Sequence, residues 1–330
     1  MRIVVTGSSG FIGFNLCKSL LTNGHNVIGI DSHTSDYNVS IKDQRATILT
    51  GFPNFQFIKL DLLNEGIDKI LAGKKADCLV HLAARDIYYS SDKTIKYTPF
   101  LIDNVVGTSK MFELAVSLGV KKFIFGSTFS VYGKTKKTIL TEKKILPSPI
   151  SPHGSSKLAA EHVISFLHRY YKVPAIILRI GSTYGPGMRP FTVIPLIIHR
   201  LYHNEPIDFF DINLSRDFIY VDDVVNFIEA TFNKRIKFHS MNIATGKTYS
   251  LVEVVNKIAV IMGKEKYETA QHEMKFDKFL QKDVIISIDR AKKLLKYTPH
   301  TDIDFGLKTT VDYYMKNLDV LEKSTHHKIS

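Results

Sequence analysis

The first residues whose types and spacing suggest chemistry are the glycines between positions 7 and 13. This segment reads Gly-Ser-Ser-Gly-Phe-Ile-Gly, and it follows a short apolar run and precedes a helical pattern. In that context glycines allow the backbone to approach a pyrophosphate group at the N-terminus of a helix. A tight turn without any ligand is the alternative. We therefore expect dinucleotide binding by Gly7, Gly10, Phe11, Ile12 and Gly13.

A carboxylate follows at the end of the next predicted strand. Asp31 lies about 20 residues after the glycines, where it can accept hydrogen bonds from the adenosine ribose hydroxyls and repel a 2'-phosphate. The two residues after Asp31 are Ser32 and His33, so no arginine stands there to pair with such a phosphate. Asp31 alone could equally cap a loop, but the two features occur in register. The sequence therefore favours NAD over NADP.

Strands alternate with helices through the first half of the chain, and this order positions the glycines and Asp31. Predicted strands cover residues 2–6, 26–30, 55–60, 78–82, 123–125 and 175–179, and predicted helices cover 11–21, 105–118 and 155–171. The alternation predicts an α/β protein with a Rossmann-type doubly wound parallel sheet. We expect an NAD-binding domain over 1–180 and a smaller C-terminal substrate-binding region over 181–330, interleaved with the first, with residues 317–330 as a frayed tail.

Composition excludes several classes of protein. The 330 residues are 44% hydrophobic and 23% charged, as in ordinary globular proteins. The net charge of +12 comes from scattered lysines without a nucleic-acid-binding motif, so we expect no nucleic-acid partner. Cys17 and Cys78 lie apart in apolar segments, which indicates neither disulfides nor a metal site. With no leader pattern and no run long enough to span a membrane, a cytoplasmic protein is expected.

Nearly the whole chain resembles a known family. The motifs that carry this resemblance occur in family order at His81-Leu82-Ala83-Ala84, Asn104 to Thr108, Ser127 to Gly133, Arg216 to Asp223 and Asn242-Ile243-Ala244. They resemble the extended short-chain dehydrogenases/reductases of the NAD-dependent epimerase/dehydratase family, which modify nucleotide sugars. Residues 36–42, 188–190 and 281–284 are most similar to UDP-glucuronate 4-epimerases.

The resemblance implies a reaction and a set of site residues. In the family, a sugar alcohol at position 4 loses hydride to NAD while a tyrosine takes its proton, and the 4-keto sugar is then reduced from its other face. A lysine four places after the tyrosine holds the nicotinamide ribose, and a nearby hydroxyl relays the proton. Carried over to this sequence, the catalytic residues are Thr128, His153 and Lys157. The additional cofactor contacts are Asp61, Leu62, Leu82, Ala83, Ala84 and Lys157, and the substrate contacts are Ser127, Thr128, Arg189 and Arg216.

One position departs from the family pattern. His153 stands where the family has its catalytic tyrosine, whereas Lys157 is kept. Free imidazole has a pKa of about 6.5, and the Lys157 ammonium should lower it, so a neutral base would be available at pH 7. Imidazole is shorter than a phenol, so water or Thr128 would have to bridge to the sugar. Tyr88 or Tyr89 is an alternative source of a phenol.

Three functions follow from these residues. The first is NAD-dependent 4-epimerisation of a UDP-hexuronic acid or related UDP-sugar. The family resemblance further implies a homodimer through the predicted helices 105–118 and 155–171. The second is a sugar-nucleotide dehydratase or decarboxylase, but those relatives carry a glutamate where this chain has Ser130. The third is a protein that binds NAD and a sugar nucleotide without catalysis, which the missing tyrosine would explain.

Overall fold

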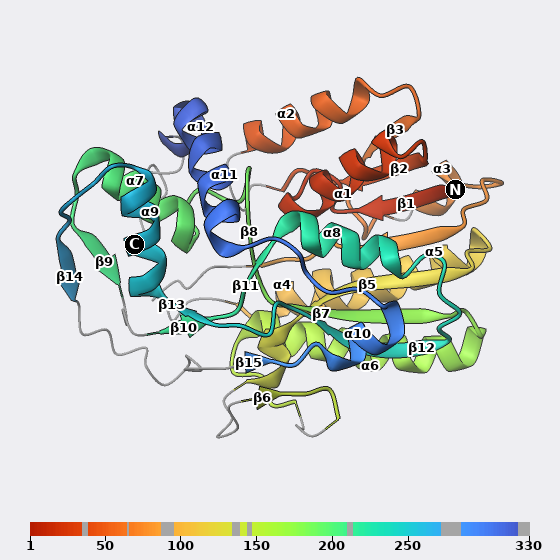
Figure 1. Cartoon of the computed structure of the whole chain (residues 1–330). Coiled ribbons are helices and arrows are strands. Elements are labelled where there is room, and N and C mark those ends of the chain that lie inside the picture. The colour runs from red at the N-terminus through yellow and green to blue at the C-terminus, as the bar shows by residue number, and fades with distance from the viewer. Residues whose placement is uncertain are drawn as a thin grey trace.

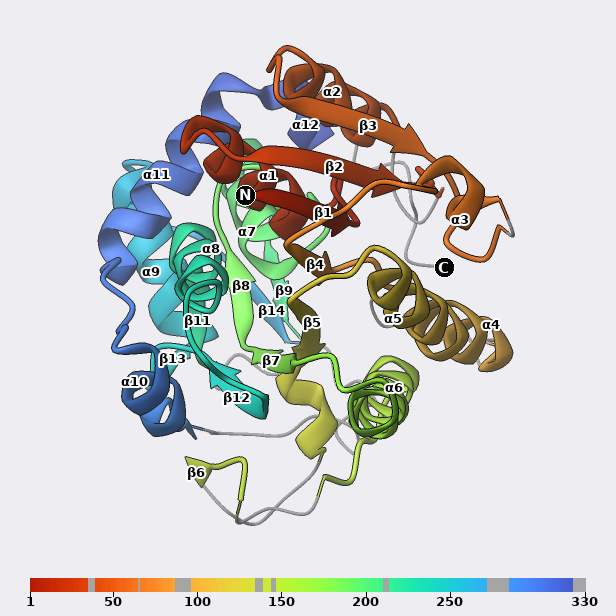
Figure 2. The same ribbon diagram turned by 90° about the vertical axis from the view of Figure 1, so that its right-hand side faces the viewer.

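A seven-stranded parallel sheet forms the centre of the molecule (Figures 1 and 2). The computed structural model describes residues 1–34, 39–64, 66–86, 96–133, 139–143, 147–209, 214–271 and 285–322. The strand order is β12-β7-β5-β4-β1-β2-β3, and every neighbouring pair is parallel. The strands are β1 (Arg2–Thr6), β2 (Asn26–Asp31), β3 (Phe55–Lys59), β4 (Cys78–His81), β5 (Lys122–Thr128), β7 (Ala175–Ile180) and β12 (Phe238–Ile243).

Helices cover both faces of this sheet (Figure 2). One face carries α1 (Phe11–Thr22), α2 (Val39–Thr50), α8 (Val221–Ala230) and α10 (Asp289–Leu295). The other carries α3 (Ile67–Ile70), α5 (Gly107–Ser117) and α6 (Pro152–Tyr171). Helix α5 continues from α4 (Thr98–Leu101) through a π-helical turn, Ile102–Val106, and a 3-10 turn, Phe129–Tyr132, follows β5. The predicted doubly wound α/β fold is confirmed.

The last strand of the sheet comes from the second half of the chain. Strand β12 pairs with β7 from Phe238 opposite Ala175 to Ile243 opposite Ile180, and α8 packs against α1. The core under this face joins Ile3 of β1 to residues of α8, β12 and α10. Residues beyond position 180 therefore complete the central sheet as well as forming the region described next.

A second core lies where the strands of the sheet end. Strand β1 runs from the N-terminus toward this region in Figure 1. The helices α7 (Val193–His203), α9 (Leu251–Ile261), α11 (Ile303–Lys316) and α12 (Leu318–Glu322) surround it. Short strand pairs lie among these helices: β8 (Ser182–Tyr184) with β11 (Phe218–Tyr220), β9 (Ile207–Phe209) with β14 (Thr269–Gln271), and β10 (Ser215–Arg216) with β13 (Tyr249–Ser250). A further pair, β6 (Ile139–Leu140) with β15 (Ile285–Ile286), belongs to a separate small cluster that buries Leu140 and Ile286.

The chain end differs from the expected frayed tail. Helix α12 lies within the range 317–330, and it buries Val320 and Leu321 against the second core. Burial of these two apolar side chains stabilises a short helix that sequence polarity alone does not predict. Residues 323–330 lie outside the described residues. Within the described ranges, no helix combines the length and apolar character needed to cross a bilayer.

Candidate active site

The glycine turn after β1 is closely packed against the segment after β4. Gly7 has a φ of +71°, and a Cβ there would lie 2.8 Å from the Ala83 nitrogen. A Cβ at Gly13 would lie 2.0 Å from the Gly7 carbonyl oxygen, so no side chain fits. The hydroxyl of Ser8 is buried in this turn and has no hydrogen-bond partner among the described residues. An unpaired buried hydroxyl beside the N-terminus of α1 fits the phosphate oxygens of a dinucleotide.

Asp31 ends β2 directly beside the glycine turn. Its carboxylate accepts hydrogen bonds from the backbone N–H groups of Ser9 (3.0 Å) and His33 (2.9 Å). These bonds fix the carboxylate, and its remaining lone pairs can still accept from ribose hydroxyls. The structure thus brings together the glycines and Asp31, because β1 and β2 are neighbours whose carboxyl ends meet at one edge.

Asp61 and Leu62 follow β3, two strands away from the glycine turn. Asp61 is exposed, and its Oδ1 accepts from the Leu63 N–H at 2.8 Å, so its carboxylate closes a local turn. Leu62 is half-buried. Contacts of Asp61 and Leu62 with the cofactor stay predictions.

Arg45 is a residue of this region that the sequence did not indicate. From α2 its Nη1 donates to the Ser9 carbonyl at 3.0 Å, and its Nη2 donates to the Gly187 carbonyl. Arg45 therefore ties the glycine turn to the loop that leads into Arg189. Helix α2 mixes charged and apolar residues without a clear period, so no pattern singles out this arginine.

The first two turns of α6 carry the predicted acid-base residues His153 and Lys157. Ser151 caps this helix by accepting from the Gly154 N–H at 3.0 Å. His153 and Lys157 are four residues apart and share one face of the helix. The Lys157 ammonium lies 4.0 Å from the centre of the Phe125 ring, and burial lowers the pKa of Lys157 to about 7.

The hydrogen bond of His153 determines which ring nitrogen can act as a base. Its Nδ1–H donates to the Arg85 carbonyl at 3.2 Å. A carbonyl only accepts, so Nδ1 carries the proton and Nε2 keeps its lone pair in neutral imidazole. Burial is the main cause that lowers the pKa of His153, and the Lys157 charge adds to it while Asp86 opposes it. The direction agrees with the expectation from sequence, but the leading cause is burial.

Asp86 joins two of the predicted residues, and the sequence did not single it out. Its Oδ2 accepts from Arg189 Nη2 at 2.6 Å, and its Oδ1 lies 3.6 Å from Nδ1 of His153. Burial opposes its ionisation, yet the charges of His153 and Arg189 hold the pKa of Asp86 below its usual value. One carboxylate therefore connects His153 of α6 to Arg189, which lies in the loop before α7.

The segment that carries Asp86 is held by Asn104 of the π-helical turn. The Asn104 side chain accepts from the Arg85 N–H at 2.7 Å and donates to the Arg85 carbonyl at 3.0 Å. It also donates to Ser156 Oγ of α6 at 2.8 Å. This places the Arg85 carbonyl that receives the His153 hydrogen bond, so Asn104 acts as a positioning residue for the imidazole.

Ser127 and Thr128 end β5 beside the start of α6. Thr128 Oγ1 accepts from the Ser130 N–H at 3.1 Å and lies 3.2 Å from Ser130 Oγ. A Cβ at Gly154 would approach the Ser130 carbonyl to 2.7 Å, so the lack of a side chain lets the two segments touch. Ser127 instead donates to buried Glu161 at 2.6 Å, and its contact with substrate stays a prediction.

The remaining predicted residues lie on other elements than the group around His153. Leu82 and Ala83 are half-buried and Ala84 is exposed after β4, which is the strand next to β1. Arg216 lies on β10 in the C-terminal region, where its Nη1 donates to the Ser215 carbonyl at 3.1 Å. Tyr88, Tyr89 and, of the epimerase-like segments, residues 36–38 and 281–284 lie outside the described residues.

Comparisons with known proteins agree with this architecture. The model of the NAD dependent epimerase/dehydratase family matches residues 3–244. The chain is 30% identical to the UDP-glucuronate 4-epimerase of Thermodesulfobacterium geofontis, over 97% of this chain and 98% of the relative. It is 29% identical to the dTDP-D-glucose 4,6-dehydratase of Mus musculus, over 96% and 89%. A crystal structure of the UDP-glucuronic acid 4-epimerase of Bacillus cereus, with UDP-glucuronic acid and NAD, superposes with a TM-score of 0.87 at 29% identity, over 96% of this chain and 100% of the other.

The family match spans most of the chain, and the central sheet, the glycine turn and Asp31 provide its nucleotide-binding frame. The resemblance seen in the sequence motifs is therefore confirmed, and the chain belongs to the NAD dependent epimerase/dehydratase family.

Proposed function

We propose that this protein is an epimerase that inverts carbon 4 of a UDP-hexuronic acid or a closely related UDP-sugar, with His153 in place of the usual catalytic tyrosine. The observation that carries the proposal is the group formed by His153, Lys157 and Asp86 beside Thr128. The similarity of the chain to UDP-glucuronate 4-epimerases over nearly its whole length supports the choice of substrate class. The two buried free thiols, Cys17 and Cys78, suit the reducing cytoplasm.

In the proposed mechanism, Nε2 of His153 accepts the proton of the sugar 4-hydroxyl, directly or through the Thr128 hydroxyl. The Arg85 carbonyl holds Nδ1–H, and the Asp86 carboxylate stabilises the imidazolium that forms. The glycine turn and Asp31 would hold NAD, which would supply the hydride acceptor and donor for carbon 4. Lys157 would hold the nicotinamide ribose, and His153 returns the proton to the new hydroxyl.

Dehydratase relatives make elimination the competing reaction. The family resemblance implies that dehydratases carry a glutamate two places after the relay threonine. This chain has Ser130 at that position, within hydrogen-bonding distance of Thr128. A serine hydroxyl is too weak an acid-base group to replace a carboxylate near pH 7. Epimerisation is therefore favoured over dehydration.

Incubation with UDP-glucuronate and NAD, without added reductant, tests the proposal. Chromatography should show UDP-galacturonate approaching an equilibrium that is also reached from the opposite epimer. A dehydrated product would instead establish the dehydratase function. Retention of NAD and UDP-sugar without any product would establish a binding protein and contradict the proposal.

Asp86 should control the preference between acidic and neutral sugars. A substrate carboxylate has to compete with Asp86 for Arg189, since the two are paired at 2.6 Å. Asp86→Asn should therefore raise the ratio of kcat/KM for UDP-glucuronate to that for UDP-glucose by about tenfold or more, the size of one charge-assisted hydrogen bond. Arg189→Ala should lower the same ratio. Because any loss of activity caused through His153 affects both substrates equally, it cancels in this ratio.

Asp103→Asn is the matched control, because Asp103 pairs with the adjacent Arg85 at 2.5 Å rather than with Arg189. Its ratio should stay at the wild-type value. An unchanged ratio in both Asp86→Asn and Arg189→Ala would show that Arg189 does not hold the sugar carboxylate.

We further propose that the protein forms a homodimer through α6 and the continuous α4–α5 helix. Phe166 and Tyr170 on α6 are 56% and 68% exposed, and Ile102 and Val106 are exposed on the neighbouring helix. Large apolar side chains exposed on two neighbouring helices are typical of an interface. Phe166→Asp should therefore shift the mass measured by light scattering from dimer to monomer, while Phe305→Asp on α11 should not. A wild-type monomer would refute the proposal.

A further inference from the structure

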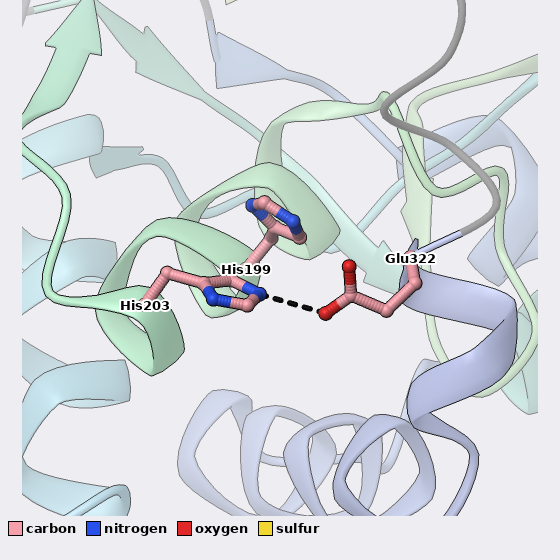
Figure 3. A group of neighbouring side chains, drawn as sticks. All are labelled: His199, His203 and Glu322. Atoms are coloured by element: carbon pink, nitrogen blue, oxygen red, sulfur yellow. Dashed lines mark hydrogen bonds and ion pairs between the residues drawn. The ribbon is translucent and has the colours of Figure 1, made fainter.

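Two histidines and a glutamate gather away from the proposed active site (Figure 3). His199 and His203 are one turn apart on α7, and Glu322 comes from α12. The His203 ring points at the Glu322 carboxylate, with Nε2 2.7 Å from Oε1, and the His199 ring lies beside them. One ligand atom from each of the three residues lies within 4.8 Å of the other two.

The chemistry of these three groups is that of a zinc ligand set. Imidazole nitrogen and carboxylate oxygen both bind Zn²⁺ at about 2.0–2.2 Å, and three protein ligands with one water form a common tetrahedral arrangement. Such bond lengths place ligand atoms roughly 3.3 Å apart. The His203 and Glu322 ligand atoms, now 2.7 Å apart, would have to separate by about 0.6 Å. Ligand atoms as far as 4.8 Å apart would have to approach by up to about 1.5 Å, and side-chain rotation can provide both changes.

The surroundings favour a cation at this place. His199 is buried, and the centre of its ring lies 4.5 Å from the centre of the His203 ring. His203 is the last residue of α7, where the helix dipole places partial negative charge. Glu322 adds a full negative charge at hydrogen-bonding distance.

We propose that His199, His203 and Glu322 bind a zinc ion that fastens α12 to α7. Ligands 119 residues apart in sequence would be joined, so the ion restrains a long stretch of the unfolded chain and stabilises the C-terminal region. The site departs from the expectation that no metal is bound. The sequence did not indicate it, because the histidine pair and the glutamate meet only through the packing of α12 on α7.

A simple ion pair between His203 and Glu322, without metal, is the competing explanation. Titration of the chelator-treated full-length protein with Zn²⁺, followed by calorimetry, separates the two. We expect one ion per chain at micromolar affinity and a rise in melting temperature that a chelator reverses. His199→Gln, His203→Gln and Glu322→Gln should each weaken binding at least tenfold and remove the rise, while epimerase activity stays at the wild-type level.

His326 and His327 follow in the sequence and can bind zinc by themselves, so the double variant His326→Ala/His327→Ala is the matched control. It should retain the single ion and the gain in melting temperature. The proposal is overturned if the wild type binds no zinc, if the three Gln variants bind it as the wild type does, or if only the tail variant loses it. Co²⁺ provides a second readout, because a tetrahedral site gives it a strong visible absorption that His203→Gln should abolish.

Discussion

The rate of 4-epimerisation should fall by about 10²–10⁴-fold when His153 is replaced by phenylalanine, which is the usual contribution of a positioned acid-base group. Phenylalanine keeps the bulk of the ring but cannot accept a proton. Steady-state assays with UDP-glucuronate should show the loss in kcat, with a smaller change in KM. Lys157→Met should also lower kcat, because it removes the ammonium that lies one turn further along α6.

The opposite substitution, His153→Tyr, should raise the rate, because a phenol can span the distance to the sugar hydroxyl. Asp86 moderates this gain. Its carboxylate lies 3.6 Å from Nδ1 of His153, where it favours an imidazolium but opposes a phenolate. The double variant His153→Tyr/Asp86→Ala should therefore be faster than His153→Tyr alone. Full activity of His153→Phe, together with no gain from tyrosine, would refute the assignment of His153 to the reacting carbon.

The pH profile distinguishes a working imidazole from a bystander. Only neutral His153 accepts a proton, so the rate falls as the pH drops through its pKa. Burial lowers that pKa, so the midpoint of the acid limb should lie below the free value of about 6.5. The limb should vanish in His153→Phe, and a limb that persists there would point to another base.

Much of the nucleotide-binding half was predictable because its signals are local. Apolar strands, a glycine turn and a terminal Asp31 occur within one strand-helix-strand unit, and their spacing alone places them at one edge of a parallel sheet. Strand β12 escaped prediction because His239, Ser240 and Asn242 interrupt its apolar pattern. Pairing with β7 overrides that weak local preference.

The candidate site was predictable only in part. Motif positions identified His153 and Lys157, which share a helix face at a spacing visible in the sequence. The ion pair of Asp86 with Arg189 joins residues 103 positions apart, and no sequence period links them. The same holds for the contact of Asn104 with the Arg85 carbonyl, which receives the hydrogen bond from Nδ1–H of His153. Such contacts depend on how the loops after the strands pack together.

A buried ion pair supports both the sheet and the segment that ends in Thr128. Glu161 of α6 accepts from Arg179 Nη2 at 2.7 Å and from Arg179 Nε at 3.1 and 3.2 Å, and it accepts from Ser127 Oγ at 2.6 Å. The two charged residues are 5% and 6% exposed. Buried charges are tolerated only while they are paired, so each partner depends on the other.

Removing one partner of this pair should be the most destabilising single change in the chain. Glu161→Ala leaves the Arg179 guanidinium buried without its carboxylate, which should lower the free energy of unfolding by about 3–5 kcal/mol. Chemical denaturation at a fixed NAD concentration measures this loss.

Asp312→Ala is the matched control, since it breaks an exposed pair with Lys308 on α11 and should lower the free energy of unfolding by at most about 0.5 kcal/mol. The double variant Glu161→Leu/Arg179→Met should be more stable than Glu161→Ala, because it leaves no charge unpaired. Equal losses in Glu161→Ala and Asp312→Ala would mean that the buried pair contributes no more than a surface one, and that Ser127 and Thr128 are held in place by backbone pairing of β5 with β7 alone.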